Sequence, residues 1–153
     1  IGMGQHGTAF AHAGMRMGPA ICYEGLYGDF YGDFVRRGAQ FMAIISNDGW
    51  WGDTPGYKHL FTISRLRAIE HRRAIARSAN TGMSGFISAR GDIGETLGWE
   101  KRGVISAAVP LNSELTFYTR YGDYLGRISE YLTLLCVLYY IAYRVKRKNY
   151  LVK

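Results

Sequence analysis

The stretch that most constrains the fold is residues 18–25, Gly-Pro-Ala-Ile-Cys-Tyr-Glu-Gly. Residues 19–23 are short, apolar and bounded by Gly18 and Gly25, a pattern that predicts a buried strand ending in a turn. Residues 26–37 have a helical pattern, and Gly38 is the expected C-terminal stop. The sequence therefore predicts a sharp turn between a strand and a helix, with a cysteine at the turn.

The same alternation of strand and helix continues along the chain. Residues 40–46 have the length and apolar content of a second buried strand. Residues 57–76 predict a long helix, and residues 86–89 and 104–111 predict two further strands. Residues 90–94 are expected to form a turn between those strands. This mixed α/β pattern is typical of a layered protein with helices outside a sheet.

The predicted helix 57–76 has an apolar face and a basic face. The apolar residues spaced for one face are Leu60, Ile63, Leu66 or Arg67, Ile69 and Ile75. The basic face carries Arg65, Arg72, Arg73 and Arg77. We expect these arginines to be solvated or ion-paired, with Glu70 as an available partner. Contact with phosphate or a lipid headgroup is the alternative.

Length and composition indicate one domain with an appendage. A chain of 153 residues can bury one core, and 48% hydrophobic and 14% aromatic residues exclude a disordered or collagen-like chain. The chain starts at Ile1, without an initiator methionine or a signal peptide, inside what the pattern indicates is a continuing domain. We therefore expect a fragment of a longer protein.

The positive charge of the chain is concentrated at its end. The formal net charge is +7, and the last ten residues contain five basic residues and no acidic one. Without these five, 14 basic residues stand against 12 acidic ones. The excess is typical of a membrane border rather than a nucleic-acid-binding face, and no nucleic-acid-binding motif accompanies the arginines.

An apolar segment precedes this basic end. Residues 125–143 would extend about 28 Å as a helix, close to the thickness of a hydrocarbon core. Arg127 and Glu130 interrupt its first turns, and the uninterrupted residues 131–143 would cover only about 20 Å. Tyrosines near its ends favour a membrane interface. We predict a transmembrane helix; a core helix or an interfacial anchor is the alternative.

The predicted span divides the chain and sets its orientation. The α/β domain occupies residues 1–120, the transmembrane helix residues 121–143 and a basic tail residues 144–153. Because basic residues favour the cytoplasmic side, the C-terminus is expected in the cytoplasm and the α/β domain on the other side of the membrane.

Cys22 is the candidate nucleophile. At a strand-to-helix turn, converging backbone N–H groups and the positive end of a helix dipole favour a thiolate and can stabilise an oxyanion. The alternative is a small buried core residue, since free cysteine is among the most buried residue types. Cys136, the second cysteine, lies in the apolar segment, so no disulfide framework is predicted.

Four blocks carry a resemblance to a known family. They are Cys22-Tyr23-Glu24, residues 46–52 (Ser-Asn-Asp-Gly-Trp-Trp-Gly), residues 67–70 (Arg-Ala-Ile-Glu) and residues 77–85 (Arg-Ser-Ala-Asn-Thr-Gly-Met-Ser-Gly). In order and spacing they resemble the carbon–nitrogen hydrolase (nitrilase) superfamily and, more narrowly, its membrane branch, the apolipoprotein N-acyltransferases. The resemblance implies a four-layer αββα sandwich, of which residues 1–120 are the C-terminal half. It also implies the bacterial inner (plasma) membrane, with the α/β domain in the periplasm.

The resemblance further implies a reaction. Cys22 would take a fatty acyl group from a phospholipid as a thioester and pass it to the N-terminal amino group of a diacylglyceryl-cysteine lipoprotein, without a cofactor or metal. The family uses a glutamate base and a lysine, both before the cysteine, and residues 1–21 contain neither. We expect both to precede Ile1, so that the fragment alone is inactive.

Neighbouring residues are assigned supporting parts by the same resemblance. Tyr23 and Glu24 support the nucleophile, although Glu24 can equally be a buried carboxylate that holds loop N–H groups. Trp50 is expected at the mouth of the site, where it would pack on an acyl chain; a tryptophan that caps the core is the alternative. Trp51 is a weaker candidate. His59 and His71 lack Cys or Asp at metal-ligand spacing, which disfavours a metal site.

Two other functions remain open from the residues. One is a nitrilase-family amidase that hydrolyses small amides, with the segment from Tyr121 onward as an oligomerisation or core helix. The other is a non-catalytic module tethered to a membrane, because the chain lacks the glutamate and lysine of the triad. A hydrophobic span favours the acyltransferase over a soluble amidase.

Overall fold

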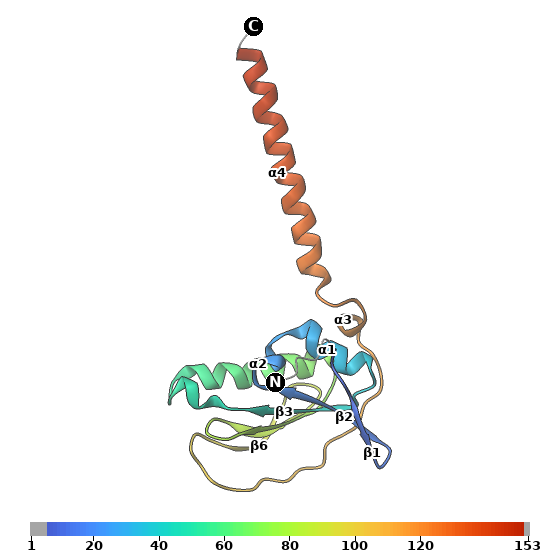
Figure 1. Ribbon diagram of the computed structural model, residues 1–153, viewed down its shortest axis with the longest axis vertical. Coiled ribbons are helices and arrows are strands. Elements are labelled where there is room, and N and C mark those ends of the chain that lie inside the picture. The colour runs from blue at the N-terminus through green and yellow to red at the C-terminus, as the bar shows by residue number, and fades with distance from the viewer. Residues whose placement is uncertain (1–5, 152–153) are drawn as a thin grey trace. The chain divides into compact units, whose positions relative to one another are not determined.

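The computed structural model describes residues 6–151, except for the side chains of residue 145 and residues 148–151. The chain separates into two compact units, Ile1–Gly122 and Asp123–Lys153. The first unit is a mixed α/β domain and the second is one long helix, which confirms the predicted α/β class (Figure 1). Each unit is described by itself.

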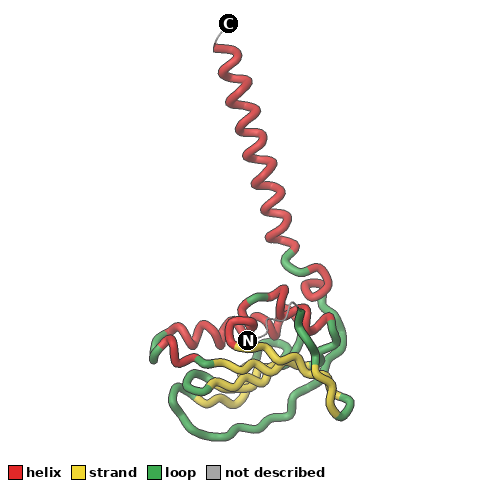
Figure 2. Tube along the Cα trace, viewed as in Figure 1, coloured by secondary structure: helices red, strands yellow, loops and turns green. Residues whose placement is uncertain are grey.

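One six-stranded sheet organises the first unit (Figure 2). Its strands, which lie in sequence order, are β1 (Phe10–His12), β2 (Met15–Ile21), β3 (Phe41–Ser46), β4 (Ile75–Ala79), β5 (Ser84–Ile87) and β6 (Ile93–Leu97). Strands β2, β3 and β4 are parallel to one another, whereas β1, β5 and β6 join antiparallel. The central parallel strands therefore end at the same edge of the sheet.

Helices cover one face of this sheet (Figure 1). The helical segments of the first unit are η1 (Cys22–Leu26), α1 (Gly28–Arg36), η2 (Asp48–Trp51), α2 (Pro55–His71) and α3 (Phe117–Tyr121). The core lies between sheet and helices, where Ala20, Met42 and Ile44 of the strands pack with Tyr31 of α1 and Phe61 of α2. Because strand side chains alternate, the residues between these point to the other face.

Two predictions near the first turn are confirmed with shifted boundaries. The strand predicted over residues 19–23 is β2, which starts earlier and ends at Ile21. The helix predicted over residues 26–37 is α1, and the chain leaves it through Arg37 and Gly38, whose φ is 97°. Glycine tolerates that left-handed conformation, which suits a helix stop. The strand predicted over residues 40–46 is β3.

The prediction of a helix over residues 57–76 is wrong at its C-terminal end. Helix α2 ends at His71, and Arg72, with a φ of 50°, caps it in the left-handed conformation. Ile75 instead begins strand β4, where it pairs with Met42 on one side and Ile87 on the other. A short apolar run is compatible with either a buried strand or a buried helix. Here the pairing with β3 and β5 determines that these residues form a strand.

The predicted faces of that helix also need correction. Arg73 and Arg77 are not on a solvated face: they are only 1% and 5% exposed. The Arg73 guanidinium donates to the backbone oxygens of Ala39, His71, Arg72 and Glu114. Glu70 pairs with Arg67 at 2.8 Å, and both lie on the buried side of α2, whereas Leu66 and Ile69 are exposed.

The end of the domain differs from the prediction as well. The strand predicted over residues 86–89 is β5, but the strand predicted over residues 104–111 is wrong: residues 101–116, all described, contain no strand. The chain turns earlier than residues 90–94, because Ser88 and Asp92 close the turn, and strand β6 begins directly after it at Ile93. Val104 is 95% exposed, so its segment lacks the neighbouring strand that β structure requires.

The second unit is α4 (Tyr124–Leu151). Its residues Tyr124–Arg144 are long and apolar enough to cross a membrane, with a mean hydropathy of 1.3. None of this window is buried in the structure. The helix predicted over residues 125–143 is confirmed as a helix; its membrane span stays a prediction.

Candidate active site

Cys22 lies where β2 ends and η1 begins. Its φ is 51°, the left-handed region that a residue with a Cβ rarely adopts. Backbone strain of this kind costs of order 1–3 kcal/mol and is concentrated at functional sites. The side chain is half-buried and its thiol is free, so Cys22 is not a fully enclosed core residue. The backbone presents this thiol at the carboxyl edge of the parallel strands.

The helix-dipole argument made from the sequence needs correction. Cys22 belongs to the five-residue η1, and α1 begins only at Gly28. The dipole of α1 therefore does not start at the thiol, and its influence falls off within about one turn. Cys22 is positioned by the end of the central strand β2 and by the bend of the backbone at Cys22 itself.

Register brings three turns to one edge of the sheet. Ile21 pairs with Ile45, and Ile45 pairs with Ser78, so β2, β3 and β4 end side by side. The segments that follow these strands are η1, η2 and the turn of residues 80–83. Three of the four blocks identified in the sequence thus meet at this edge. Ligands in open α/β sheets bind outside the carboxyl ends of the strands.

A chain of polar contacts joins these blocks behind Cys22. The Ser46 Oγ lies 3.8 Å from the Cys22 Sγ and 2.6 Å from the Asp48 Oδ1. Asp48 forms two hydrogen bonds with Arg77: Nη1 donates to Oδ2 at 3.0 Å and Nη2 to Oδ1 at 2.9 Å. Asp48 is fully buried and Arg77 is 5% exposed. This bidentate pair keeps two buried charges neutralised beside the thiol.

The turn after β4 is shaped around this pair. The Arg77 Nη1 also donates to the Met83 backbone oxygen. A Cβ on Gly82 would lie 2.1 Å from the Asp48 Oδ2, so the position accepts only glycine without displacing the carboxylate. Asn80-Thr81-Gly82 follows strand β4, and Gly82 packs against the Asp48 side chain.

The sequence analysis missed Ser46, Asp48 and Arg77 as members of the site. All three lie in blocks that carried the resemblance, which was the available signal. Arg77 was instead assigned to a helix face, because helical periodicity was extended into β4.

Tyr23 and Glu24 lie in η1 next to Cys22. The Ile21 backbone N–H donates to the Glu24 Oε2 at 2.8 Å, so this half-buried carboxylate holds the strand end. That contact agrees with the alternative proposed for Glu24, a carboxylate that holds loop N–H groups. Tyr23 is 48% exposed.

Trp50 lies in η2, close in sequence to Asp48. It is 84% exposed, so the alternative of a tryptophan that caps the core is wrong. Trp51 is 40% exposed and packs closely on Gly56, where an added Cβ would lie 2.5 Å from the ring. Trp50 is thus the aromatic side chain of this loop that is available to a ligand.

The fourth block, Arg67 to Glu70, lies on α2 in a buried polar cluster, and the Arg67 guanidinium reaches Gly28 just after η1. The cluster joins α2 to α1 and α3: the His71 Nδ1 lies 2.8 Å from the Thr119 Oγ1, and the Thr116 hydroxyl donates to the Glu70 backbone oxygen. Burial, followed by the nearby charge of Arg67, lowers the pKa of His71 to about 3. The contacts of His71 hold α2 against α1 and α3, which is a structural role.

Metal chemistry has no visible support in the part of the chain that the structure describes. No group of three His, Cys, Asp or Glu side chains there could hold a metal ion. His71 is buried against Thr119, and His59 is exposed.

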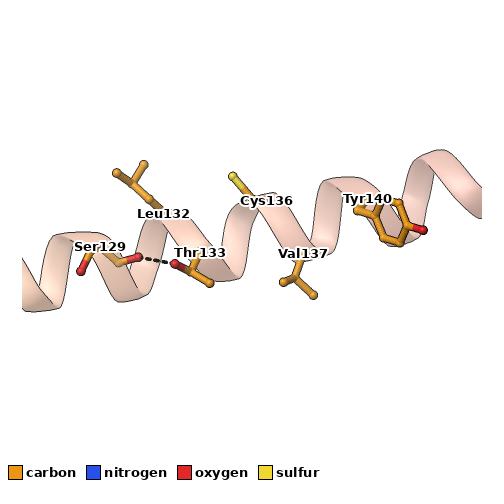
Figure 3. Close-up of a pocket in the computed structure, with 6 residues that line it drawn as sticks. All are labelled: Ser129, Leu132, Thr133, Cys136, Val137 and Tyr140. Carbon is orange, nitrogen blue, oxygen red and sulfur yellow. Dashed lines mark hydrogen bonds between the residues drawn. The ribbon is translucent and has the colours of Figure 1, made fainter.

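A hollow on α4 is a separate feature (Figure 3). Its lining comes from this helix alone: Ser129, Leu132, Thr133, Cys136, Val137 and Tyr140. The Thr133 hydroxyl donates to the Ser129 backbone oxygen at 2.7 Å, which satisfies it within the helix. This face carries no charged or catalytic group.

Comparisons with known proteins identify the family of this chain. The carbon-nitrogen hydrolase family model matches residues 2–115. The apolipoprotein N-acyltransferase of Chlorobaculum tepidum is 45% identical over 109 residues, which cover 71% of this chain and 20% of the relative. That of Rhizobium meliloti is 42% identical over 97 residues, which cover 63% and 18%. The chain thus spans about a fifth of the length of these curated relatives.

Solved structures show the same fold. An amidase from Nesterenkonia sp. superposes with a TM-score of 0.52 at 18% identity, covering 65% of this chain and 40% of the amidase. A branch 10 member of the nitrilase superfamily from Saccharomyces cerevisiae superposes with a TM-score of 0.58 at 20% identity, covering 67% and 40%. The family model, the relatives and the shared fold confirm the resemblance seen in the sequence, and the chain belongs to the carbon–nitrogen hydrolase family.

Proposed function

We propose that this chain is the cysteine-bearing part of an apolipoprotein N-acyltransferase and that Cys22 is its nucleophile. The observation that carries the proposal is the strained, half-buried Cys22 at the carboxyl edge of the sheet, in a chain 45% identical to a relative with that name. The base and the oxyanion-stabilising lysine of the family are not assigned to residues of this chain.

The reaction has two steps. The Cys22 thiol gives up its proton, the thiolate attacks the acyl carbonyl of a phospholipid, and the ester C–O bond breaks, so that a thioester remains and the lysophospholipid leaves with the proton on its hydroxyl. The α-amino group of a diacylglyceryl-cysteine lipoprotein then attacks the thioester carbonyl, the C–S bond breaks, and the proton lost by the amine passes to the sulfur. The amide product leaves and the Cys22 thiol is restored. A backbone N–H of η1 near Tyr23 would help to hold the oxyanion.

Residues around Cys22 have supporting parts in this proposal. Glu24, which binds the Ile21 N–H, holds the strand end that sets the position of the thiol. The exposed ring of Trp50 offers an apolar surface on which an acyl chain can pack. No part of this chemistry requires a cofactor or a metal.

The membrane context rests on α4. We propose that Tyr124–Arg144 spans the bacterial inner membrane and that the basic residues after it lie in the cytoplasm. The α/β domain then lies in the periplasm, the side on which lipoprotein acceptors would be met.

The test is acyl transfer by the gene product that contains this chain, with a phospholipid donor and a synthetic diacylated lipopeptide. Cys22→Ala is expected to lower turnover by at least roughly a thousandfold, because it removes the nucleophile. The wild-type protein should also form a hydroxylamine-sensitive acyl adduct on the peptide that contains Cys22, detectable by mass spectrometry. Cys136→Ala is the matched control and should keep turnover.

Other outcomes would replace the proposal. Turnover that survives Cys22→Ala would show a different nucleophile. Hydrolysis of small amides without acyl transfer would favour the amidase, the activity for which the Nesterenkonia protein of the same fold is named. A protein with neither activity would favour the non-catalytic module.

A further inference from the structure

The hydroxyl of Ser46 stands between two acceptors. Its oxygen lies 2.6 Å from the Asp48 Oδ1 and 3.8 Å from the Cys22 Sγ. A hydroxyl has one proton to donate, so it can serve only one of these acceptors at a time. Ser46 is 7% exposed, which limits the access of water as a substitute donor.

Asp48 does not depend on Ser46 for its partners. Both of its oxygens accept from Arg77, at 3.0 and 2.9 Å, within a pair that is almost fully buried. If the Ser46 hydroxyl turns away, Asp48 keeps two charge-assisted hydrogen bonds. The cost of turning the hydroxyl toward Cys22 is therefore the loss of one bond among three.

The charge on Cys22 changes how well its sulfur competes with the Asp48 carboxylate for this proton. A neutral thiol sulfur is a weak acceptor, so the proton of Ser46 lies on Asp48 while Cys22 is protonated. A thiolate is a charged acceptor, and hydrogen bonds to charged groups are about twice as strong as neutral ones. Loss of the thiol proton thus favours rotation of the hydroxyl toward sulfur.

We propose that Ser46 is a positioning residue that donates its hydroxyl proton to the Cys22 thiolate, while the Asp48–Arg77 pair holds Ser46 in place. The inference rests on the proposed role of Cys22 as nucleophile and adds a residue that stabilises its reactive form. Donation to the charged form stabilises the thiolate relative to the thiol. The hydrogen bond also holds the Cys22 sulfur in position from the side of β3, because Ser46 is the last residue of that strand.

The experiment measures the reactivity of Cys22 against pH in the gene product that contains this chain, in detergent micelles. Iodoacetamide labelling rates are followed by peptide mass spectrometry from about pH 6 to about pH 10, since the thiolate is the reacting form. The midpoint of the rate–pH curve reports the ionisation of the thiol.

Ser46→Ala is expected to raise the midpoint for Cys22 by about one pH unit, because the thiolate loses a donor. Ser46→Thr keeps the hydroxyl and should restore the midpoint to within a few tenths of a unit. The control Ser78→Ala, on the exposed side of the neighbouring strand β4, should leave the curve unchanged.

A purely structural Ser46, which only binds Asp48, would not move the midpoint. An unchanged or lowered midpoint in a folded Ser46→Ala variant would therefore overturn the proposal. If Ser46→Ala does not fold, Ser46→Val against Ser46→Thr makes the same comparison between side chains of matched shape. The labelling does not depend on acyl transfer, so failure of this inference and failure of the proposed function are separately visible.

Discussion

His71 is almost fully enclosed although its side chain can carry a charge. The ring lies 5.0 Å from the Tyr31 ring of α1 and 5.3 Å from the Tyr118 ring of α3, with Arg36, Arg67 and Arg73 nearby. Burial and the positive charge of these arginines, Arg67 foremost, lower its pKa from 6.5 to about 3. The folded protein therefore accommodates the neutral His71 ring, which is hydrogen-bonded to the Thr119 hydroxyl.

This residue makes stability depend on pH. The unfolded chain takes up the His71 proton near pH 6.5 and the folded chain only near pH 3, so stability is lost as the pH falls through this range. Between pH 7.5 and pH 5 we expect the free energy of unfolding to fall by about 2 kcal/mol. His71→Asn should flatten this dependence in urea denaturation, whereas His59→Asn, on the exposed side of α2, should not. A slope that survives His71→Asn would assign the dependence to other groups.

At the scale of elements, the turn between β4 and β5 holds the buried charges of the site together. Arg77 of β4 reaches Asp48 of η2 and the backbone of Met83, and so connects η2, β4 and the turn after β4 at the carboxyl edge. Gly82 makes this possible because it has no Cβ to meet the carboxylate. A buried ion pair needs close geometry to offset the cost of removing both charges from water.

Gly82→Ala is expected to destabilise the domain by roughly 1–3 kcal/mol, because the new methyl group displaces the Asp48 carboxylate. Gly98→Ala is the matched control: an added Cβ there meets no atom within 4 Å. Chemical denaturation of the two variants measures the difference. Equal stability of Gly82→Ala and Gly98→Ala would show that the turn adjusts without disturbing the pair.

At the scale of the whole molecule, both units expose apolar surface. On the sheet face away from the helices, Ile21 and Ile45 are 61% and 56% exposed. This is the face on which the expected four-layer sandwich has its second sheet. In the other unit, apolar side chains surround the membrane-spanning candidate of α4. Exposed apolar surface of this extent is typical of interfaces with protein or membrane.

The proposed topology predicts which positions an impermeant reagent can reach. In a background of Cys22→Ala and Cys136→Ala, Arg90→Cys should react with a membrane-impermeant maleimide in spheroplasts, because the α/β domain is outside. Lys146→Cys should react only after lysis, because positive charge retains the C-terminal end in the cytoplasm. Both residues are exposed in the structure. Labelling of Lys146→Cys in intact spheroplasts would contradict the orientation.

Local pattern alone determined much of this protein. The strand before Cys22, α1 and its stop at Gly38, and the apolar helix α4 follow from short apolar runs, glycine positions and hydrophobic length. These signals are local, because each depends on residues that are neighbours along the chain. The residues of the four blocks were likewise sufficient to identify the family.

Only the tertiary structure decided the rest. Residues 74–76 extend the helical pattern of α2, yet they enter the sheet because β3 and β5 supply hydrogen-bonding partners on both sides. The apolar residues 104–111 lack such partners and form no strand. Arg77 therefore leaves the expected solvated face and pairs with Asp48 behind Cys22. Strand pairing and burial of charge depend on residues distant along the chain, and a local pattern does not contain that information.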